Sequence, residues 1–80
     1  MKLPRDLSGD ELVKALAKYG YQITRHRGSH IRLTTQRNGE HHVTVPRHDA
    51  LRIGTLGEIL QMVAIHLGMS REELQEDLFD

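Results

Sequence analysis

The amino-acid sequence predicts an α+β fold, a two-layer sandwich of α-β-β-β-α order with a short C-terminal helix. Two segments carry apolar residues at helical spacing, and each opens on a Ser or Thr followed three residues later by Glu. Between them lie three short runs in which apolar and polar residues alternate, as in strands that bury one face. With 80 residues and no linker-like stretch, we expect one domain spanning 1–80.

The first helix is predicted to begin after Ser8. Ser8 and Glu11 form a capping box, in which each side chain satisfies a free backbone N–H at the helix start. An apolar stripe follows at helical spacing: Leu12, Ala15, Leu16 and Tyr19. Gly20 is expected to end the helix because glycine readily adopts the left-handed conformation.

Three strands are predicted next, over Tyr21–His26, His30–Gln36 and His41–Pro46. Arg37–Glu40 contains an Asn-Gly pair, a strong hairpin signal. Alternation gives the strands an apolar face, which we expect the helices to cover: Tyr21, Ile23, Ile31, Leu33, Val43 and Val45. The opposite face is polar and rich in histidine: Gln22, Thr24, His26, His30, Arg32, Thr34, His42 and Thr44.

The second long helix is predicted over Leu56–Leu67, with Thr55 and Glu58 as its capping box and Gly68 at its end. Its apolar stripe consists of Leu56, Ile59, Leu60, Val63 and Leu67. Ser70 and Glu73 form a third capping box, which opens the short C-terminal helix. Met62 and Ile65 lie outside the stripe, so we expect them to meet that helix or a partner.

Charge is distributed unevenly along this formally neutral chain. Residues 25–52 contain two acids and six arginines (25, 27, 32, 37, 47 and 52), whereas residues 53–80 contain six acids and one arginine. A basic centre followed by an acidic end favours a nucleic-acid partner. The chain has no cysteine, and the charged segment 1–10 resembles neither a signal peptide nor a membrane span. We therefore expect a cytoplasmic protein that does not bind membranes.

Several short motifs, in this order and at these spacings, resemble the HicA family, also called YcfA-like. They are Leu7-Ser8-Gly9, Tyr19-Gly20-Tyr21, Gly28-Ser29-His30, Val45-Pro46-Arg47-His48 and the segment 54–60. The resemblance extends from about Leu7 to Leu78. It implies a fold like that of double-stranded-RNA-binding domains and the toxin half of a type II toxin–antitoxin pair. It also implies a ribosome-independent mRNA interferase that a HicB-type antitoxin neutralises, with His30 as the essential histidine. HicA proteins tend to be basic, and this chain departs from that tendency.

RNA cleavage by attack of a 2′-hydroxyl needs a proton acceptor and a proton donor but no metal and no cofactor. Histidine suits either role, because its unperturbed pKa of about 6.5 lies near neutrality. We predict His30 as general base or acid, with Gly28 allowing a tight turn near a phosphate. The Ser29 hydroxyl or the backbone N–H groups of this turn are predicted to hold a nonbridging oxygen.

The arginines of the basic segment are predicted to bind phosphate. Arg27 and Arg32 are candidates for stabilising the charge of the transition state. Arg25, Arg47 and Arg52 are expected to follow the RNA backbone, where each neutralised phosphate adds salt dependence.

The second proton-transfer group is left open among His26, His42 and solvent. Because His30 and His42 are predicted to lie on the same face of the sheet, a metal site between them is an alternative. No convergent carboxylate supports it, so we expect no functional metal. Two other functions remain at this point: a catalytically silent RNA-binding module and a protein-interaction domain. Met62, Ile65 and Met69 either pack on the C-terminal helix or form the seam of a homodimer or of a hetero-oligomer with the antitoxin.

Overall fold

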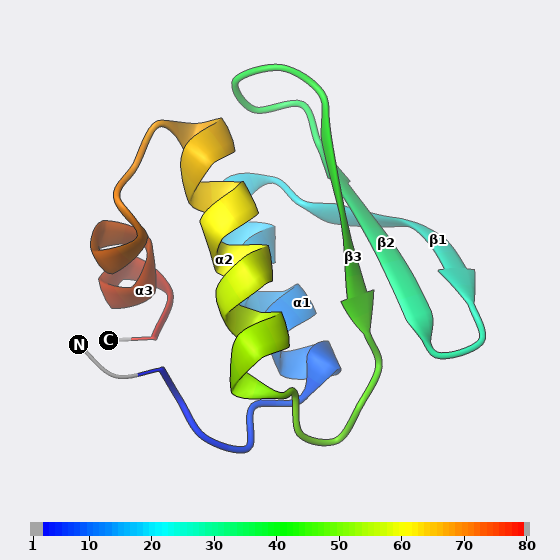
Figure 1. The fold of residues 1–80 in the computed structure, drawn as a ribbon. Helices are drawn as coiled ribbons and strands as arrows, with labels where there is room; N and C mark the ends of the chain where they lie inside the picture. The colour runs from blue at the N-terminus through cyan, green and yellow to red at the C-terminus, as the bar shows by residue number, and fades with distance from the viewer. Residues whose placement is uncertain (1–2, 80) are drawn as a thin grey trace.

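The computed structural model describes residues 3–79, which form helices on one side of a three-stranded antiparallel sheet (Figure 1). The elements follow in the order α1 (Gly9–Leu16), the 3-10 turn η1 (Ala17–Tyr19), β1 (Gln22–Arg27), β2 (His30–Thr35), β3 (His41–Pro46), α2 (Ile53–Leu67) and α3 (Arg71–Phe79). The strands are arranged β1-β2-β3, so β2 is central. The predicted fold class is confirmed.

Local capping signals fix two of the three helix starts. The Ser8 hydroxyl accepts a hydrogen bond from the Glu11 amide at 3.0 Å, and the Glu11 carboxylate accepts one from the Ser8 amide at 2.9 Å. Ser70 and Glu73 make the same reciprocal pair at the start of α3, with both bonds at 3.0 Å. Both predicted capping boxes are therefore confirmed.

The capping box predicted at Thr55 is wrong. α2 begins at Ile53, and Arg52 occupies the N-cap position without a side-chain hydrogen bond. The Leu56 amide already donates to the Arg52 carbonyl at 2.9 Å. Thr55 therefore lies inside the first turn, where its side chain cannot cap the helix.

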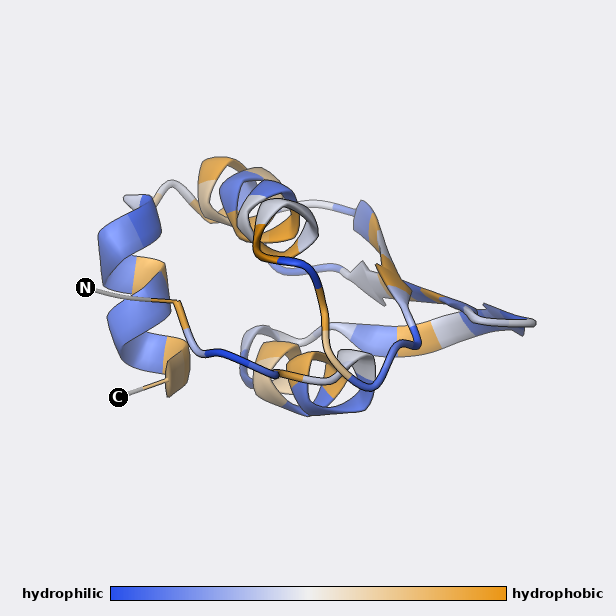
Figure 2. Ribbon diagram, turned by 60° about the horizontal axis from the view of Figure 1, so that its bottom comes forward, coloured by the Kyte–Doolittle hydropathy of each residue, from blue (hydrophilic) through white to orange (hydrophobic). Residues whose placement is uncertain are grey.

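The core lies between the helices and the inner face of β2 and β3. The strands bury Ile31, Leu33, Val43 and Val45, and the helices bury Leu12, Leu16, Leu56, Leu60 and Val63 against them. Tyr19 and Tyr21 are buried where the first helical segment meets the sheet. Figure 2 shows α1 and α2 opposite each other beside the base of the sheet.

The β1–β2 hairpin projects away from the helices (Figures 1 and 2). All six residues of β1 are exposed, and Ile23 retains 55% of its accessible surface. The prediction that Ile23 is covered by helices is therefore wrong. The strand also begins and ends one residue later than the predicted Tyr21–His26.

α3 packs through Leu74 and Gln75, which are buried. Met62 and Ile65, by contrast, are 44% and 69% exposed. α3 therefore does not bury Met62 and Ile65, whereas Met69 is partly buried against the core. The alternative that Met62 and Ile65 meet a partner stays a prediction. Within residues 3–79 no single helix is long and apolar enough to cross a membrane, and α2 with α3 meets that criterion only as a pair bent by 107°.

Candidate active site

A β-bulge decides which side chains of β1 reach the open face of the sheet. Ile23 pairs with Leu33, but the next pair is Arg25 with Arg32, so β1 contains one extra residue at position 24. From there on His26 lies opposite Ile31, and Arg27 lies opposite His30. Cross-strand partners share a face, and Ile31 is buried on the helix side.

The bulge therefore exchanges two sets of residues between the faces. His26 is directed to the helix side of the sheet, away from His30, so its predicted position on the polar face is wrong. Arg25 and Arg27, which strict alternation places on the helix side, join His30 on the open face. A single inserted residue inverts the alternation of everything that follows it in the strand.

The open face carries a shallow groove of about 290 Å³ that is lined by Arg25, Arg27, His30, Arg32 and Thr44. The register arranges these residues in two rows across the sheet. We call Arg27 and His30 the histidine row, and Arg25, Arg32 and Thr44 the arginine row. The structure thus brings the predicted catalytic histidine together with three predicted phosphate-binding arginines.

The turn that precedes His30 is short and anchored. Because Arg27 pairs with His30, only Gly28 and Ser29 connect the two strands. Gly28 has a φ of +57°, a value that side-chain-bearing residues rarely adopt, and no atom lies within 4 Å of the position a Cβ would take. The Ser29 carbonyl accepts a hydrogen bond from the Arg47 amide at 2.6 Å, which ties the turn to the end of β3.

The groove is positively charged because its cations have no acidic neighbours. Among residues 3–79, Arg25, Arg27 and Arg32 form no ion pair. Arg47 pairs with Asp10 at 3.3 Å, and Arg52 lies at the start of α2 outside the lining of the groove. The structure therefore does not bring these last two predicted phosphate ligands into the site.

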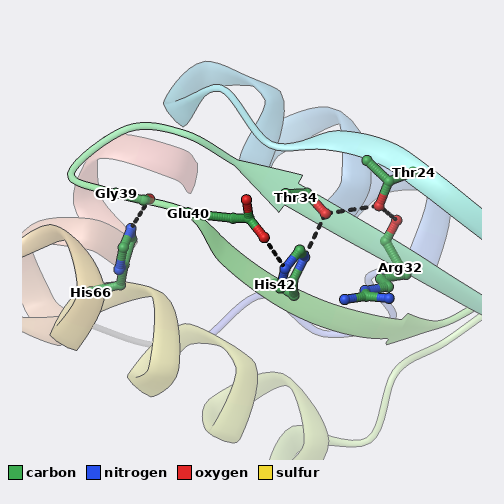
Figure 3. A network of polar contacts seen from close by, with 7 residues as sticks. All are labelled: Thr24, Arg32, Thr34, Gly39, Glu40, His42 and His66. Carbon is green, nitrogen blue, oxygen red and sulfur yellow. Dashed lines mark hydrogen bonds and ion pairs between the residues drawn. The ribbon is translucent and has the colours of Figure 1, made fainter.

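His42 belongs to a separate polar network on the same face (Figure 3). Its Nε2–H donates to the Glu40 carboxylate at 2.8 Å, and its Nδ1 is 2.7 Å from the Thr34 hydroxyl, which in turn lies 2.8 Å from the Thr24 hydroxyl. His42 pairs with Thr34, four residues along β2 from His30, a separation of roughly 13 Å at the usual rise per residue.

Two expectations about His42 are therefore wrong: it does not lie beside His30, and the two rings are not at metal-ligand distance. Within residues 3–79 no three His, Cys, Asp or Glu side chains are grouped so that they could hold a metal ion. Both ring nitrogens of His42 already have hydrogen-bond partners, so neither is free to act on a ligand in the groove.

A second histidine cluster was not predicted from the sequence. The rings of His41 and His66 stack with centroids 4.3 Å apart, and His41 Nδ1 is 2.8 Å from the Tyr21 hydroxyl. His66 Nε2 lies 2.7 Å from the Arg37 carbonyl and 3.0 Å from that of Gly39, so α2 is joined to the β2–β3 loop (Figure 3). Burial lowers the pKa of His41, and the neighbouring His66 and His42 lower it further. Burial raises the pKa of Tyr21 to about 12.

Gly9 supports the site from behind, and its position here was also not predicted. Its amide donates to the His48 carbonyl at 2.9 Å, and a Cβ at this position would meet the Pro46 carbonyl oxygen 2.1 Å away. The start of α1 thus lies directly against the segment that holds the Gly28–Ser29 turn. No sequence spacing reveals this, because the approach depends on how α1 packs on β3.

A comparison with protein families identifies the family of this chain. The family model described as the HicA toxin of bacterial toxin–antitoxin systems matches residues 9–65, which include every residue of the groove. Searches of curated proteins and of solved structures find no match.

Proposed function

The chain belongs to the HicA family of bacterial toxin–antitoxin toxins, and from this premise we propose that it is an RNA-cleaving toxin with His30 as its catalytic residue. The observation that carries the proposal is the groove, in which an exposed histidine lies among three arginines without acidic partners. A proton-transfer group beside fixed positive charge is what cleavage of a phosphodiester requires.

The reaction proceeds by attack of a ribose 2′-oxygen on the adjacent phosphorus. His30 acts as the base that takes the 2′-hydroxyl proton or as the acid that protonates the departing 5′-oxygen, as the new P–O bond forms and the old one breaks. Arg27, its neighbour in the histidine row, stabilises the charge that grows on the nonbridging oxygens. A positioned proton-transfer group contributes about 10²–10⁴-fold to the rate.

Water supplies the second proton transfer. His26 is directed to the other face of the sheet, and His42 lies four residues along the strand with both nitrogens engaged. Of the three alternatives left by the sequence, these positions favour solvent.

We propose mRNA as the substrate, cleaved in the cytoplasm and without the ribosome. Tyr19 and Tyr21 are buried, and the groove is lined by no Tyr, Phe or Trp, so bases find no large aromatic ring to stack on there. Contacts to phosphates and ribose hydroxyls fit this surface better. A HicB-type antitoxin would inhibit the toxin by placing an acidic or loop-rich surface over the groove.

His30→Ala tests the proposal, with His26→Ala as the matched control. Both histidines are exposed and lie on neighbouring strands, but they are directed to opposite faces of the sheet. We expect His30→Ala to retain the circular-dichroism spectrum and RNA binding, to lose cleavage by about a hundredfold or more, and to stop arresting growth. His26→Ala should cleave like the unmodified protein. Unchanged cleavage by His30→Ala would refute the assignment, and RNA binding without cleavage by the unmodified protein would favour a silent binding module.

A further inference from the structure

The two rows of the groove lie at different positions along the strands. Arg27 and His30 form one cross-strand pair, and Arg25 and Arg32 form the next pair on the same face, two residues further along. Two residues of a strand span about 6.8 Å. Consecutive phosphates of an extended RNA strand are separated by a comparable distance, so the rows are spaced for neighbouring phosphates.

The arginine row brings two positive charges together without a counter-ion from the described part of the chain. Arg25 and Arg32 are directly opposite each other, and like charges in that position destabilise a sheet. Within the described part of the chain neither forms an ion pair. Arg32 is half-buried, which limits how far its guanidinium can move away from Arg25. Thr44, opposite Arg32 on β3, adds a hydroxyl donor to the same row.

These observations point to one ligand chemistry. Two guanidinium groups and a hydroxyl present many N–H and O–H donors and no acceptor with negative charge, which matches a phosphate diester. The histidine row holds the phosphate that is cleaved. A second phosphate at the arginine row therefore belongs to the adjacent nucleotide of the same strand.

We propose that Arg25, Arg32 and Thr44 form a subsite for the phosphate next to the scissile one, an inference that rests on the proposed function. Arg32 then acts on the neighbouring phosphate and Arg27 on the reacting one. The subsite sets the register of the RNA strand and positions its 2′-hydroxyl, so the groove recognises a pair of consecutive phosphates.

The test uses an RNA oligonucleotide that the protein cleaves at one mapped linkage. In a series of otherwise identical oligonucleotides, one phosphate at a time is replaced by an uncharged methylphosphonate that follows a 2′-O-methyl sugar. The reference carries the same sugar with an ordinary phosphate. We expect loss of charge at one of the two linkages flanking the scissile phosphate to lower kcat/KM by about tenfold or more, and loss at distant linkages to have little effect.

Arg25→Ala identifies the protein side of this contact. The same methylphosphonate should cost Arg25→Ala less activity than it costs the unmodified protein, because one of the two charge-assisted contacts to that phosphate is already absent. Arg52→Ala, which removes an exposed arginine outside the groove, should show the full loss. Equal losses for Arg25→Ala and the unmodified protein at every linkage would overturn the subsite. Both arginines are exposed, and circular dichroism verifies that the variants fold.

Measuring binding of the same oligonucleotides separates this inference from the proposed function. If the coupling with Arg25 appears in binding but RNA is not cleaved, or His30→Ala cleaves normally, the subsite stands and the proposed catalytic role fails. If cleavage depends on His30 but no flanking phosphate couples to Arg25, the proposed function stands and the subsite is refuted.

Discussion

Replacing Gly9 by alanine should unfold much of the protein at temperatures where the unmodified chain is stable. The added Cβ would lie 2.1 Å from the Pro46 carbonyl oxygen and 3.1 Å from the Arg47 Cα, both backbone atoms. Ordinary contact requires 3.4–4 Å, so the start of α1 must move away from β3. That movement stretches the 2.9 Å hydrogen bond from the Gly9 amide to the His48 carbonyl.

The magnitude follows from three contributions. Overpacking of this kind costs about 1–3 kcal/mol, and loss of the hydrogen bond adds about 0.5–1.5 kcal/mol. The higher helix propensity of alanine returns up to about 1 kcal/mol. We therefore expect a loss of about 2–3 kcal/mol in the free energy of unfolding, which for a domain of this size lowers the melting temperature by roughly 10–20 °C.

Thermal and urea denaturation followed by circular dichroism measure this loss. Gly54→Ala is the control, because Gly54 also lies in the first turn of a helix but has no atom within 4 Å of its Cβ position. That variant should be as stable as the unmodified chain or slightly more stable. Equal melting temperatures for Gly9→Ala and Gly54→Ala would refute the close approach of α1 to β3.

Three further predictions follow from the site and its surroundings. Gly28→Ala has space for its methyl group but a φ of +57°, so we expect a loss of about 1–2 kcal/mol from backbone strain alone, measured by urea denaturation and refuted by unchanged stability. His41 has a lowered pKa in the folded state. Its contribution to stability is therefore present above about pH 6.5 and is lost as the pH falls through the lower folded-state value. The melting temperature should drop on acidification below about pH 6.5, and a drop of the same size in His41→Gln would contradict this origin. A plot of log affinity for single-stranded RNA against log salt has a negative slope. Arg27→Ala should make that slope less steep by about 0.7, whereas an unchanged slope would show that Arg27 contacts no phosphate.

The features that could be predicted from the sequence are those set by neighbours in the chain. A capping box needs only Ser8 and Glu11, and the turns need only a glycine at a position of positive φ, as at Gly28 and Gly39. The predicted box at Thr55 failed because the preceding residues continue the helix to Ile53. The sequence offers two possible starts for this helix, at Ile53 and after Thr55, and the choice between them depends on how the helix packs.

The bulge at Thr24 could not be predicted, because nothing local marks it. Thr24 and Arg25 are ordinary strand residues, and the extra residue is visible only in the pairing with β2. The sequence therefore put His26 on the polar face with His30, whereas the pairing places Arg25 and Arg27 there instead. The stacking of His41 on His66 could not be predicted for a similar reason, since the two residues are brought together only by the packing of α2.

A neutral net charge does not weaken the groove as an anion site. The molecule measures 31 Å along its longest axis, and the acidic helix α3 lies at the opposite end from the β1–β2 hairpin (Figures 1 and 2). At physiological ionic strength the Debye length is about 8 Å, so the potential in the groove is set by Arg25, Arg27 and Arg32 and hardly at all by α3.

Near 0.01 M salt the Debye length increases to about 30 Å, and the α3 carboxylates should then oppose binding. Substituting Glu72 and Glu76, which are exposed and form no ion pair in the described residues, by glutamine should raise RNA affinity at low salt but not at physiological salt. An equal gain under both conditions would place α3 in direct contact with the RNA.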